Sequence, residues 1–516
     1  MANQDTNEKL IKLRKKSKLG GGEKRIAKQH EKGKLTARVR LAELLDPASF
    51  HELEPFVAQN SNSPEVDDST SVVNGVVTGY GQINGRTVFV YAQDFTVMGG
   101  SLGEMQSHKI CRVMDLAAQN GAPIIGLIDS GGARIQEGVH SLKGYAEIFR
   151  RNSLYSGVVP QISLILGPCA GGAAYSPALT DFIVMVEKQS YMFITGPNVI
   201  KEITGEEIDF ESLGGAQVHM SISGVASLSA KTELESLSLC RTLLGYLPSN
   251  NVENPPCIAP SDDPFRIDKE LNTIIPKDVK KPYNMHEVIR RVVDQNSFFE
   301  IQPTFAINSI AGFARFNGCP VGIVAQEPSA LAGVIDIDAS DKITRFVRFC
   351  DTFNIPLVTF VDSPGFLPGV NQEHKGIIRH GAKILYAYSE ASVPKVSIIT
   401  RRAFGGAYIV MSSKYLGTDI NYAWPTAEIA VMGAEGAVNI LYRKEINNAE
   451  DPKAERERLV DEYKENYLTP YTAAKAGIID EVILPSETRV KIISALSVIK
   501  EKHVQNPARK HGNSPV

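Results

Sequence analysis

Short apolar runs alternate along the chain with longer segments in which apolar residues recur every three or four positions. Ile124–Ile128 and Ile162–Leu166 are runs of the first kind, and Lys109–Ala118 has the second pattern. Runs without regular polar alternation are typical of parallel strands buried on both faces, and the second spacing is typical of amphipathic helices. The first part of the chain therefore predicts an α/β fold, with ligands expected at the carboxyl ends of strands.

The same order of elements recurs about 233 residues later, with apolar runs at Leu357–Val361 and Val396–Ile399 and a helical segment at Lys342–Cys350. Individual residues keep the register, and after one inserted residue the offset becomes 234. Matching positions include Gly79 with Gly312, Ala92-Gln93 with Ala325-Gln326, Lys109-Ile110 with Lys342-Ile343, Asp129-Ser130 with Asp362-Ser363, and Gly171-Gly172-Ala173 with Gly405-Gly406-Ala407. We interpret the chain as two tandem domains of one fold, related by an internal repeat.

The boundary between the two copies is expected in segment 249–282, which is rich in Pro, Asn and Asp. Such a composition is typical of linkers, because these residues favour turns over helices and strands. We place the division near residue 260, which gives an N-terminal domain of residues 1–260 and a C-terminal domain of residues 261–516.

A Gly-Gly-Ala turn follows the second apolar run in each copy. Glycine allows positive φ and close approach of a ligand, and backbone N–H groups exposed there can stabilise an anion. We therefore predict two oxyanion holes; the alternative is that these glycines only permit close packing of helix and strand. The candidate donors are Gly171 and Gly172 in the first copy and Gly406 and Ala407 in the second.

Composition adds few constraints. Hydrophobic residues make up 43% and charged residues 22%, as in ordinary globular proteins. With 55 basic and 58 acidic residues the net charge is −3, which gives no support for binding to nucleic acid. No segment approaches the roughly 20 apolar residues of a membrane span, and the N-terminus lacks the apolar core of a secretory signal. A cytoplasmic location is expected.

One segment departs from this even charge, since Lys9–Arg40 contains thirteen Lys or Arg residues against two acidic residues. We interpret it as a solvated pair of amphipathic helices. The alternative is that a few of these cations meet the phosphates of a nucleotide-like ligand. The residues expected on the buried side are Leu10, Leu13, Ile26, Leu35 and Leu41.

The six cysteines are scattered and form no CxxC pair. They predict neither a zinc ribbon nor a disulfide scaffold, so we expect reduced, partly buried thiols and no metal site. The chain also lacks a Gly-x-Ser-x-Gly elbow, an HExxH motif and a GxxxxGK[ST] loop. This inventory suits a reaction that forms enolates and needs no nucleophile from the protein.

Longer motifs carry a resemblance to a known family. The segments concerned are GGGEKRIAKQHEKGKLTAR (20–38), QDFTVMGGSLGEM (93–105), DSGGARIQEG (129–138), GPCAGGAAYSPALTDF (167–182), DSPGFLPG (362–369), FGGAY (404–408) and YAWPTAEIAVMGAEGA (422–437). They resemble the N- and C-domains of biotin-dependent acyl-CoA carboxyltransferases over essentially the whole chain. The resemblance implies two crotonase-like domains and transfer of CO2 from carboxybiotin to the α-carbon of a short acyl-CoA.

The same resemblance implies roles for the two Gly-rich turns. The hole at Gly171 and Gly172 would hold the thioester oxygen of acyl-CoA, and the hole at Gly406 and Ala407 the ureido oxygen of biotin. Ile409 stands where members that prefer propionyl-CoA commonly carry Asp, which favours acceptance of acetyl-CoA as well as propionyl-CoA. The further expected substrate-binding residues are Gly131, Gly132, Ala133, Gly405, Tyr408 and Ile409.

The resemblance also implies partners, because no ATP-binding loop and no Met-Lys-Met biotinylation signal occurs in the chain. A separate biotin carboxylase and a biotin carboxyl carrier are expected, together with a homo-oligomer, usually a hexamer, whose active sites form between subunits. Two alternatives use related domains in reverse: the α subunit of a methylmalonyl-CoA decarboxylase and a transcarboxylase. A crotonase-type hydratase or isomerase is a third alternative, with Glu104, Glu137 and Glu373 as candidate carboxylates.

Overall fold

The structure is a computed structural model that describes residues 2–57, 74–260, 262–278 and 281–515. It divides into two compact units, Met1–Glu253 and Asn254–Val516. The division lies inside the linker-like segment 249–282, slightly before the expected boundary at residue 260. Each unit contains an eight-stranded sheet, in agreement with the predicted α/β repeat.

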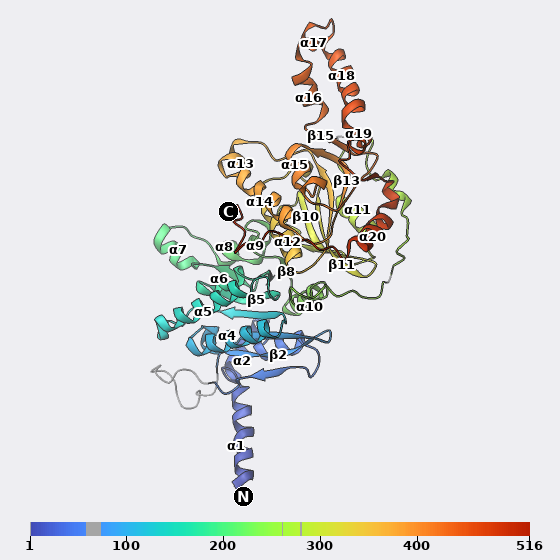
Figure 1. Ribbon diagram of the computed structural model, residues 1–516. Helices are drawn as coiled ribbons and strands as arrows, with labels where there is room; N and C mark the ends of the chain where they lie inside the picture. Colours follow the sequence, from blue (N-terminus) through green and yellow to red (C-terminus); the bar gives the residue numbers. More distant parts are fainter. Residues whose placement is uncertain (1, 58–73, 261, 279–280, 516) are drawn as a thin grey trace. The chain divides into compact units, whose positions relative to one another are not determined.

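The sheet of unit 1 has the order β1-β2-β3-β4-β5-β6-β8, with β7 paired to the end of β5 (Figure 1). β1 to β3 are antiparallel, and the pairs from β3 onward are parallel. The strands are β1 (His51–Leu53), β2 (Val76–Ile83), β3 (Arg86–Gln93), β4 (Ile124–Ser130), β5 (Gln161–Ala170), β6 (Phe182–Val186), β7 (Tyr191–Phe193) and β8 (Leu228–Ala230).

The core of unit 1 lies between the sheet and two helices, α4 and α5, which also pack against each other. α4 contributes Ile110, Val113 and Met114 to this core, and α5 contributes Tyr145 and Ile148. The helices are α1 (Ala2–Ser17), α2 (Glu23–Glu31), α3 (Ala37–Leu44), α4 (Glu104–Gln119), α5 (Val139–Tyr155), α6 (Gly172–Ala178), α7 (Pro197–Thr204), α8 (Phe210–Gly214), α9 (Ala216–Ser221) and α10 (Glu233–Leu244).

Unit 2 repeats this topology strand for strand, with the order β16-β14-β13-β12-β11-β10-β9 and with β15 paired to the end of β13. The antiparallel pairs again come first in sequence, and the later pairs are parallel. The strands are β9 (Phe299–Ile301), β10 (Ser309–Phe316), β11 (Cys319–Gln326), β12 (Leu357–Ser363), β13 (Lys395–Phe404), β14 (Ile420–Ala423), β15 (Glu428–Ala430) and β16 (Glu481–Val482).

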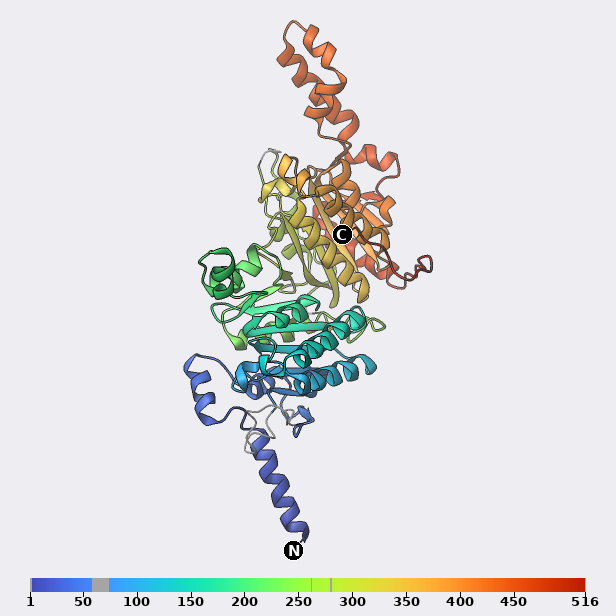
Figure 2. The same ribbon diagram turned by 90° about the vertical axis from the view of Figure 1, so that its left-hand side faces the viewer.

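In unit 2, α12 and α14 pair as α4 and α5 do in unit 1, and residues of α11 and α20 join the core. α16 to α18 extend away from the sheet of this unit (Figures 1 and 2) and have a small apolar cluster of their own. The helices are α11 (Met285–Val292), α12 (Ile337–Thr352), α13 (Val370–His374), α14 (Ile377–Glu390), α15 (Gly405–Val410), α16 (Ala434–Leu441), α17 (Arg443–Asn448), α18 (Pro452–Tyr463), α19 (Pro470–Lys475) and α20 (Thr488–Ile499).

The elements predicted from the apolar patterns are confirmed. The four apolar runs lie in β4, β5, β12 and β13, and the two helical segments lie in α4 and α12. β4 and β12 continue past the apolar residues through the Asp-Ser pair, whose residues are fully buried. Within the described part of the chain, no helix is both long and apolar enough to span a membrane.

The interpretation of the basic segment as a solvated helix pair is wrong in part. It forms three helices, and of the five expected buried residues only Leu41 is fully buried, whereas Leu10 is exposed. Lys34 and Arg40 are buried rather than solvated, because each forms an ion pair with a buried carboxylate. Sequence periodicity could not reveal this, because the partner carboxylate, Asp129, lies far along the chain.

The expectation that all six cysteines are free is also wrong, because Cys257 and Cys319 form a disulfide. The segment just after the unit boundary runs back along the turn between β10 and β11. The Ile258 N–H donates to the Gly318 carbonyl at 3.0 Å, and Arg315 Nη1 donates to the Pro256 carbonyl at 3.0 Å. Within the described residues, the remaining cysteines are free and buried: Cys111, Cys169, Cys240 and Cys350.

This disulfide should make the stability of unit 2 sensitive to reductant. The bond joins residues 62 positions apart, and a loop of this length restricts the unfolded chain by about 4 kcal/mol. We expect dithiothreitol to lower the denaturant midpoint of the wild-type chain. A chain with Cys257→Ser and Cys319→Ser should start at the lower midpoint and not respond. Equal midpoints for all samples would mean that the bond contributes nothing to stability.

Candidate active site

The turn between β5 and α6 is the first of the predicted glycine sites. Gly171 adopts φ 59° and ψ −128°, and its N–H donates to the Phe193 carbonyl at 3.0 Å. The prediction that Gly171 is a free donor is therefore wrong, since the β5–β7 ladder continues through its amide. Gly172 is the first residue of α6, and the first N–H groups of a helix have no acceptor inside it. Gly172 is the candidate donor that remains.

A second candidate donor lies in the loop that follows β4. The Gly131 N–H donates to the Gly99 carbonyl at 3.0 Å and the Gly132 N–H to Ser130 Oγ at 3.1 Å, so both amides are engaged. Ala133 forms a parallel bridge with Leu102. The neighbours of Ala133 make the two hydrogen bonds of this bridge, so the amide of Ala133 itself points away from it.

The strand register brings this loop to the Gly171-Gly172 turn. Ser130 pairs with Cys169, and a Cβ on Gly132 would stand 2.9 Å from the Ala170 carbonyl oxygen. Such an approach is possible because Gly132 has no side chain and adopts φ 102°. The candidate hole of unit 1 therefore consists of the amides of Ala133 and Gly172.

Unit 2 repeats this arrangement with one residue that sequence reasoning missed. Ile335 makes a parallel bridge to Phe366, which occupies the place of Ala133 in the repeat. Gly405 adopts φ 55° as the first residue of α15, directly after β13, and Gly406 follows it. A Cβ on Gly406 would stand 3.7 Å from the Phe366 ring. The candidate donors are the amides of Phe366 and Gly406, whereas the predicted Ala407 lies one residue further along and is buried.

The other predicted residues of unit 2, Tyr408 and Ile409, follow Gly406 on α15. The Tyr408 hydroxyl is buried and has no hydrogen-bond partner within the described residues, and burial raises the pKa of Tyr408 to about 12. Ile409 is 48% exposed on the first turns of the same helix.

A fully buried carboxylate stands at the end of the strand before each hole. In unit 1, Asp129 Oδ1 accepts from Lys34 Nζ at 2.8 Å and Oδ2 from Arg40 Nη1 at 2.9 Å. Arg40 Nε also donates to Glu233 at 2.7 Å. Burial raises the pKa of Asp129 and lowers that of Lys34, while the ion pairs oppose both shifts. The pattern of the sequence gave no signal for these contacts.

In unit 2, the corresponding carboxylate is Asp362, and its cations come from the neighbouring strand. Arg401 Nε donates to Asp362 Oδ2 at 3.0 Å, and Arg402 Nε donates to Oδ1 at 2.8 Å. The two units thus fix equivalent carboxylates with cations from different elements. Each carboxylate anchors the loop that carries one of the candidate donors.

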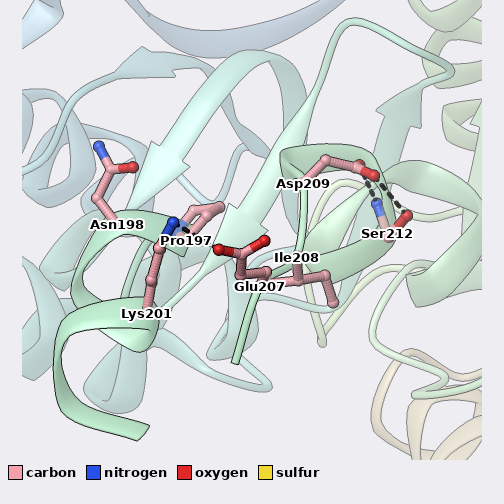
Figure 3. A pocket seen from close by; sticks show the side chains of 7 residues that line it. All are labelled: Pro197, Asn198, Lys201, Glu207, Ile208, Asp209 and Ser212. Carbon is pink, nitrogen blue, oxygen red and sulfur yellow. Dashed lines mark hydrogen bonds and ion pairs between the residues drawn. The ribbon is translucent and has the colours of Figure 1, made fainter. Parts of the chain in front are cut away.

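A cavity of about 630 Å³ lies apart from these residues, between α7 and the segment that leads into α8 (Figure 3). Its polar groups contact each other: Lys201 Nζ lies 2.6 Å from Glu207 Oε1, and Asp209 accepts from the Ser212 N–H and hydroxyl. None of the predicted site residues lines it. Its lining residues are Pro197, Asn198, Lys201, Glu207, Ile208, Asp209 and Ser212.

Comparison with known proteins decides the family. A model of the carboxyl transferase domain matches residues 28–514. The chain belongs to the carboxyl transferase domain family. It is 57% identical over 516 residues, the full length of both chains, to the carboxyltransferase subunit of a propionyl-CoA carboxylase from Haloferax mediterranei. It is also 54% identical over 507 residues, 98% of both chains, to the α subunit of a methylmalonyl-CoA decarboxylase from Propionigenium modestum.

A solved structure supports the same assignment. The transcarboxylase 12S core, a hexamer with methylmalonyl-coenzyme A bound, matches with a TM-score of 0.96 and 52% identity, over 99% of this chain and 98% of that one. The tandem crotonase-like fold expected from the resemblance is thus confirmed, and the chain is an enzyme of the acyl-CoA carboxylase family. Within this carboxyl transferase family, identity alone does not separate carboxylases from decarboxylases, because both occur among relatives of similar identity.

Proposed function

We propose that the chain is the carboxyltransferase subunit of a biotin-dependent acyl-CoA carboxylase and that it carboxylates the α-carbon of propionyl-CoA, acetyl-CoA or both. The observation that supports this best is the repetition of one donor arrangement, Ala133 with Gly172 and Phe366 with Gly406. Two substrates that both develop negative charge on an oxygen need two such sites.

The two holes would then divide the substrates between them. The amides of Ala133 and Gly172 would hold the thioester oxygen of acyl-CoA as negative charge develops on it, and those of Phe366 and Gly406 would hold the ureido oxygen of biotin. Biotin, carried on a partner, supplies the activated CO2. Backbone donors set by strand register need no reorganisation as charge develops.

The proposal includes partners and an assembly. A biotin carboxylase and a biotin carboxyl carrier would supply carboxybiotin, and the chain would work as a hexamer with active sites formed between subunits. The relatives named above support this, since one is a carboxylase subunit and another is a hexameric core. A cytoplasmic location belongs to the same proposal.

Reconstitution tests the proposed function. The chain is combined with a biotinylated carrier and a biotin carboxylase, and carboxylation of acetyl-, propionyl- and butyryl-CoA is measured with ATP and bicarbonate. We expect ATP-dependent product from acetyl-CoA or propionyl-CoA. Absence of product, together with decarboxylation of methylmalonyl-CoA by the same mixture, would instead support the decarboxylase or transcarboxylase alternative, which the 54% identity to a decarboxylase subunit keeps open.

A hydratase or isomerase receives less support from the structure, because it needs a carboxylate that is unpaired and also held in position. Glu137 Oε1 accepts from Arg134 Nη1 at 2.7 Å, and Oε2 accepts from the Glu104 N–H at 2.7 Å. Glu104 pairs with Lys143 at 2.9 Å, and Glu373 is exposed on α13. Hydration of crotonyl-CoA by the purified chain would revive this alternative.

Acyl preference should depend on Ile409. An aliphatic side chain and a carboxylate differ in polarity at a substrate pocket, and one such contact shifts selectivity by about 1–3 kcal/mol. We expect Ile409→Asp to raise the ratio of kcat/KM for propionyl-CoA over acetyl-CoA about tenfold in the reconstituted enzyme. Ile440→Asp, which alters an exposed isoleucine on α16, serves as the matched control. An unchanged ratio would show that Ile409 does not set the acyl preference.

A further inference from the structure

The two copies of the repeat bind their equivalent buried carboxylates with cations from different positions. Ser130 pairs with Cys169 in unit 1 and Ser363 with Ala403 in unit 2, so the strand register is the same in both. The two positions that precede Cys169 are Gly167 and Pro168, and those that precede Ala403 are Arg401 and Arg402. Unit 1 thus lacks the arginine pair that binds the buried carboxylate of unit 2.

The space left by the missing arginines in unit 1 is filled from elsewhere. A Cβ on Gly167 would collide with Asp129 Oδ1 and Lys34 Nζ, so no side chain fits on the strand at this point. Lys34 and Arg40, from the segment around α3, bind the carboxylate instead. The carboxylate is the constant feature, and each unit supplies its cations in its own way.

A second difference between the units lies in the loop that follows β4 in unit 1 and β12 in unit 2. In unit 1 the Gly131 N–H donates to the carbonyl of Gly99, in the turn Met98–Gly100, at 3.0 Å. The equivalent of Gly131 in unit 2 is Pro364, which has no N–H. The equivalent of Gly99 is Ala332, and its carbonyl accepts from Arg402 Nη2 at 2.9 Å. The side chain of Arg402 thus reaches the acceptor that a backbone amide reaches in unit 1.

We propose that Arg402 is a positioning residue of the candidate site in unit 2. It links the loop after β12 to the Leu331–Gly333 turn, a link that Pro364 cannot make because it has no backbone N–H. The Nε and backbone N–H of Arg402 donate to Asp362 Oδ1, near the end of β12 just before that loop, at 2.8 and 3.2 Å. Its Nη2 holds the turn at Ala332. The loop carries Phe366, whose amide is a candidate donor, so the geometry of the hole depends on this link.

The turn itself needs such support. Leu331 and Ala332 adopt φ 47° and 56°, a left-handed conformation that side chains other than glycine rarely take. The matching turn of unit 1 has glycine at its second position, Gly99. A conformation of this kind persists where surrounding contacts hold it, and Arg402 provides one of these contacts.

Hydrogen exchange tests the link without reference to activity. In Arg402→Gln, the N–H groups of Ile335 and Leu367, which form the bridge to the Phe366 loop, should exchange at least tenfold faster. The equivalent N–H groups of Leu102 and Arg134 in unit 1 should not change. Adding Pro364→Gly restores an N–H next to Ala332 and should return most of the protection. Arg443→Gln, on an exposed arginine of α17, is the matched control.

Kinetics of the reconstituted enzyme test the consequence for the site, and this arm rests on the proposed function. Arg402→Gln should lower kcat at least tenfold with little change in KM for acyl-CoA, while the double variant with Pro364→Gly should recover most of it. Unchanged exchange in Arg402→Gln, or faster exchange that Pro364→Gly does not reverse, would overturn the link. Normal kcat despite faster exchange would overturn its role in the site. An inactive wild-type chain with the expected exchange pattern would refute only the proposed function.

Discussion

Replacing Gly406 by alanine should lower carboxyl transfer by about 100-fold without affecting the fold. The backbone of Gly406 has an ordinary φ, and an added Cβ would make only an ordinary contact of 3.7 Å with the Phe366 ring. The methyl group would enter the space between Gly406 and the Phe366 ring, and we expect it to hinder the approach of a ligand oxygen to the Gly406 amide. Loss of one oxyanion donor reduces kcat by about 10²–10³. Carboxylation by the reconstituted enzyme measures the effect, and thermal unfolding confirms the fold.

The comparison with Gly172→Ala makes this prediction specific to one substrate. A Cβ on Gly172 would lie 3.2 Å from the Tyr145 ring, which must yield by a few tenths of an ångström. We expect Gly172→Ala to weaken binding of acyl-CoA, whereas Gly406→Ala should leave that binding intact. Calorimetric titration with acyl-CoA separates the two. Gly436→Ala, on α16 with only a 3.5 Å contact to Met432, is the control. Wild-type turnover in Gly406→Ala would remove this glycine from the proposed mechanism.

The repeat is the part of the structure that the sequence determined best. Apolar runs that end in Asp-Ser and in Gly-Gly-Ala recur at a constant offset, and topology follows because the same pattern buries the same strand faces in each copy. The Gly-rich turns were correctly located after β5 and β13. The pattern could not show which amides remain free. The Gly171 N–H donates to the Phe193 carbonyl, and Phe193 belongs to β7, a strand of only three residues that is too short to give a periodic signal.

The features that sequence reasoning missed depend on contacts between distant segments. Phe366 could have been found by carrying Ala133 across the repeat, since both follow Asp-Ser by the same spacing. The disulfide between Cys257 and Cys319 and the contacts of Arg40 had no such signal. The disulfide joins residues 62 positions apart, and the contacts of Arg40 join residues at least 89 positions apart. Local periodicity contains no information on such pairs. A charged run can therefore contain both solvated residues and buried ones.

Arg40 gives the strongest prediction for stability. Its side chain is fully buried and bridges Asp129 and Glu233, at 2.9 and 2.7 Å. Arg40→Met removes this cation and leaves two buried carboxylates short of a partner, which should lower the free energy of unfolding by about 3–5 kcal/mol. Denaturant unfolding of the purified chain measures the loss. If Arg40→Met does not fold, Arg40→Lys provides the measurement, because it keeps the charge but cannot bridge both carboxylates with a planar fork.

The control for this prediction lies two residues away on the same helix. Arg38 pairs with Glu52 at 2.7 Å, but its side chain is 27% exposed. Water solvates both groups when such a pair is broken, so Arg38→Met should cost about 1 kcal/mol or less. The contrast tests whether this basic segment is partly buried, because a purely solvated segment would give two small and equal losses in the free energy of unfolding. Equal losses for the Arg40 and Arg38 variants would show that the buried ion pairs of Arg40 do not stabilise unit 1. A difference of several kcal/mol would show that part of the basic segment is a structural component of the first site.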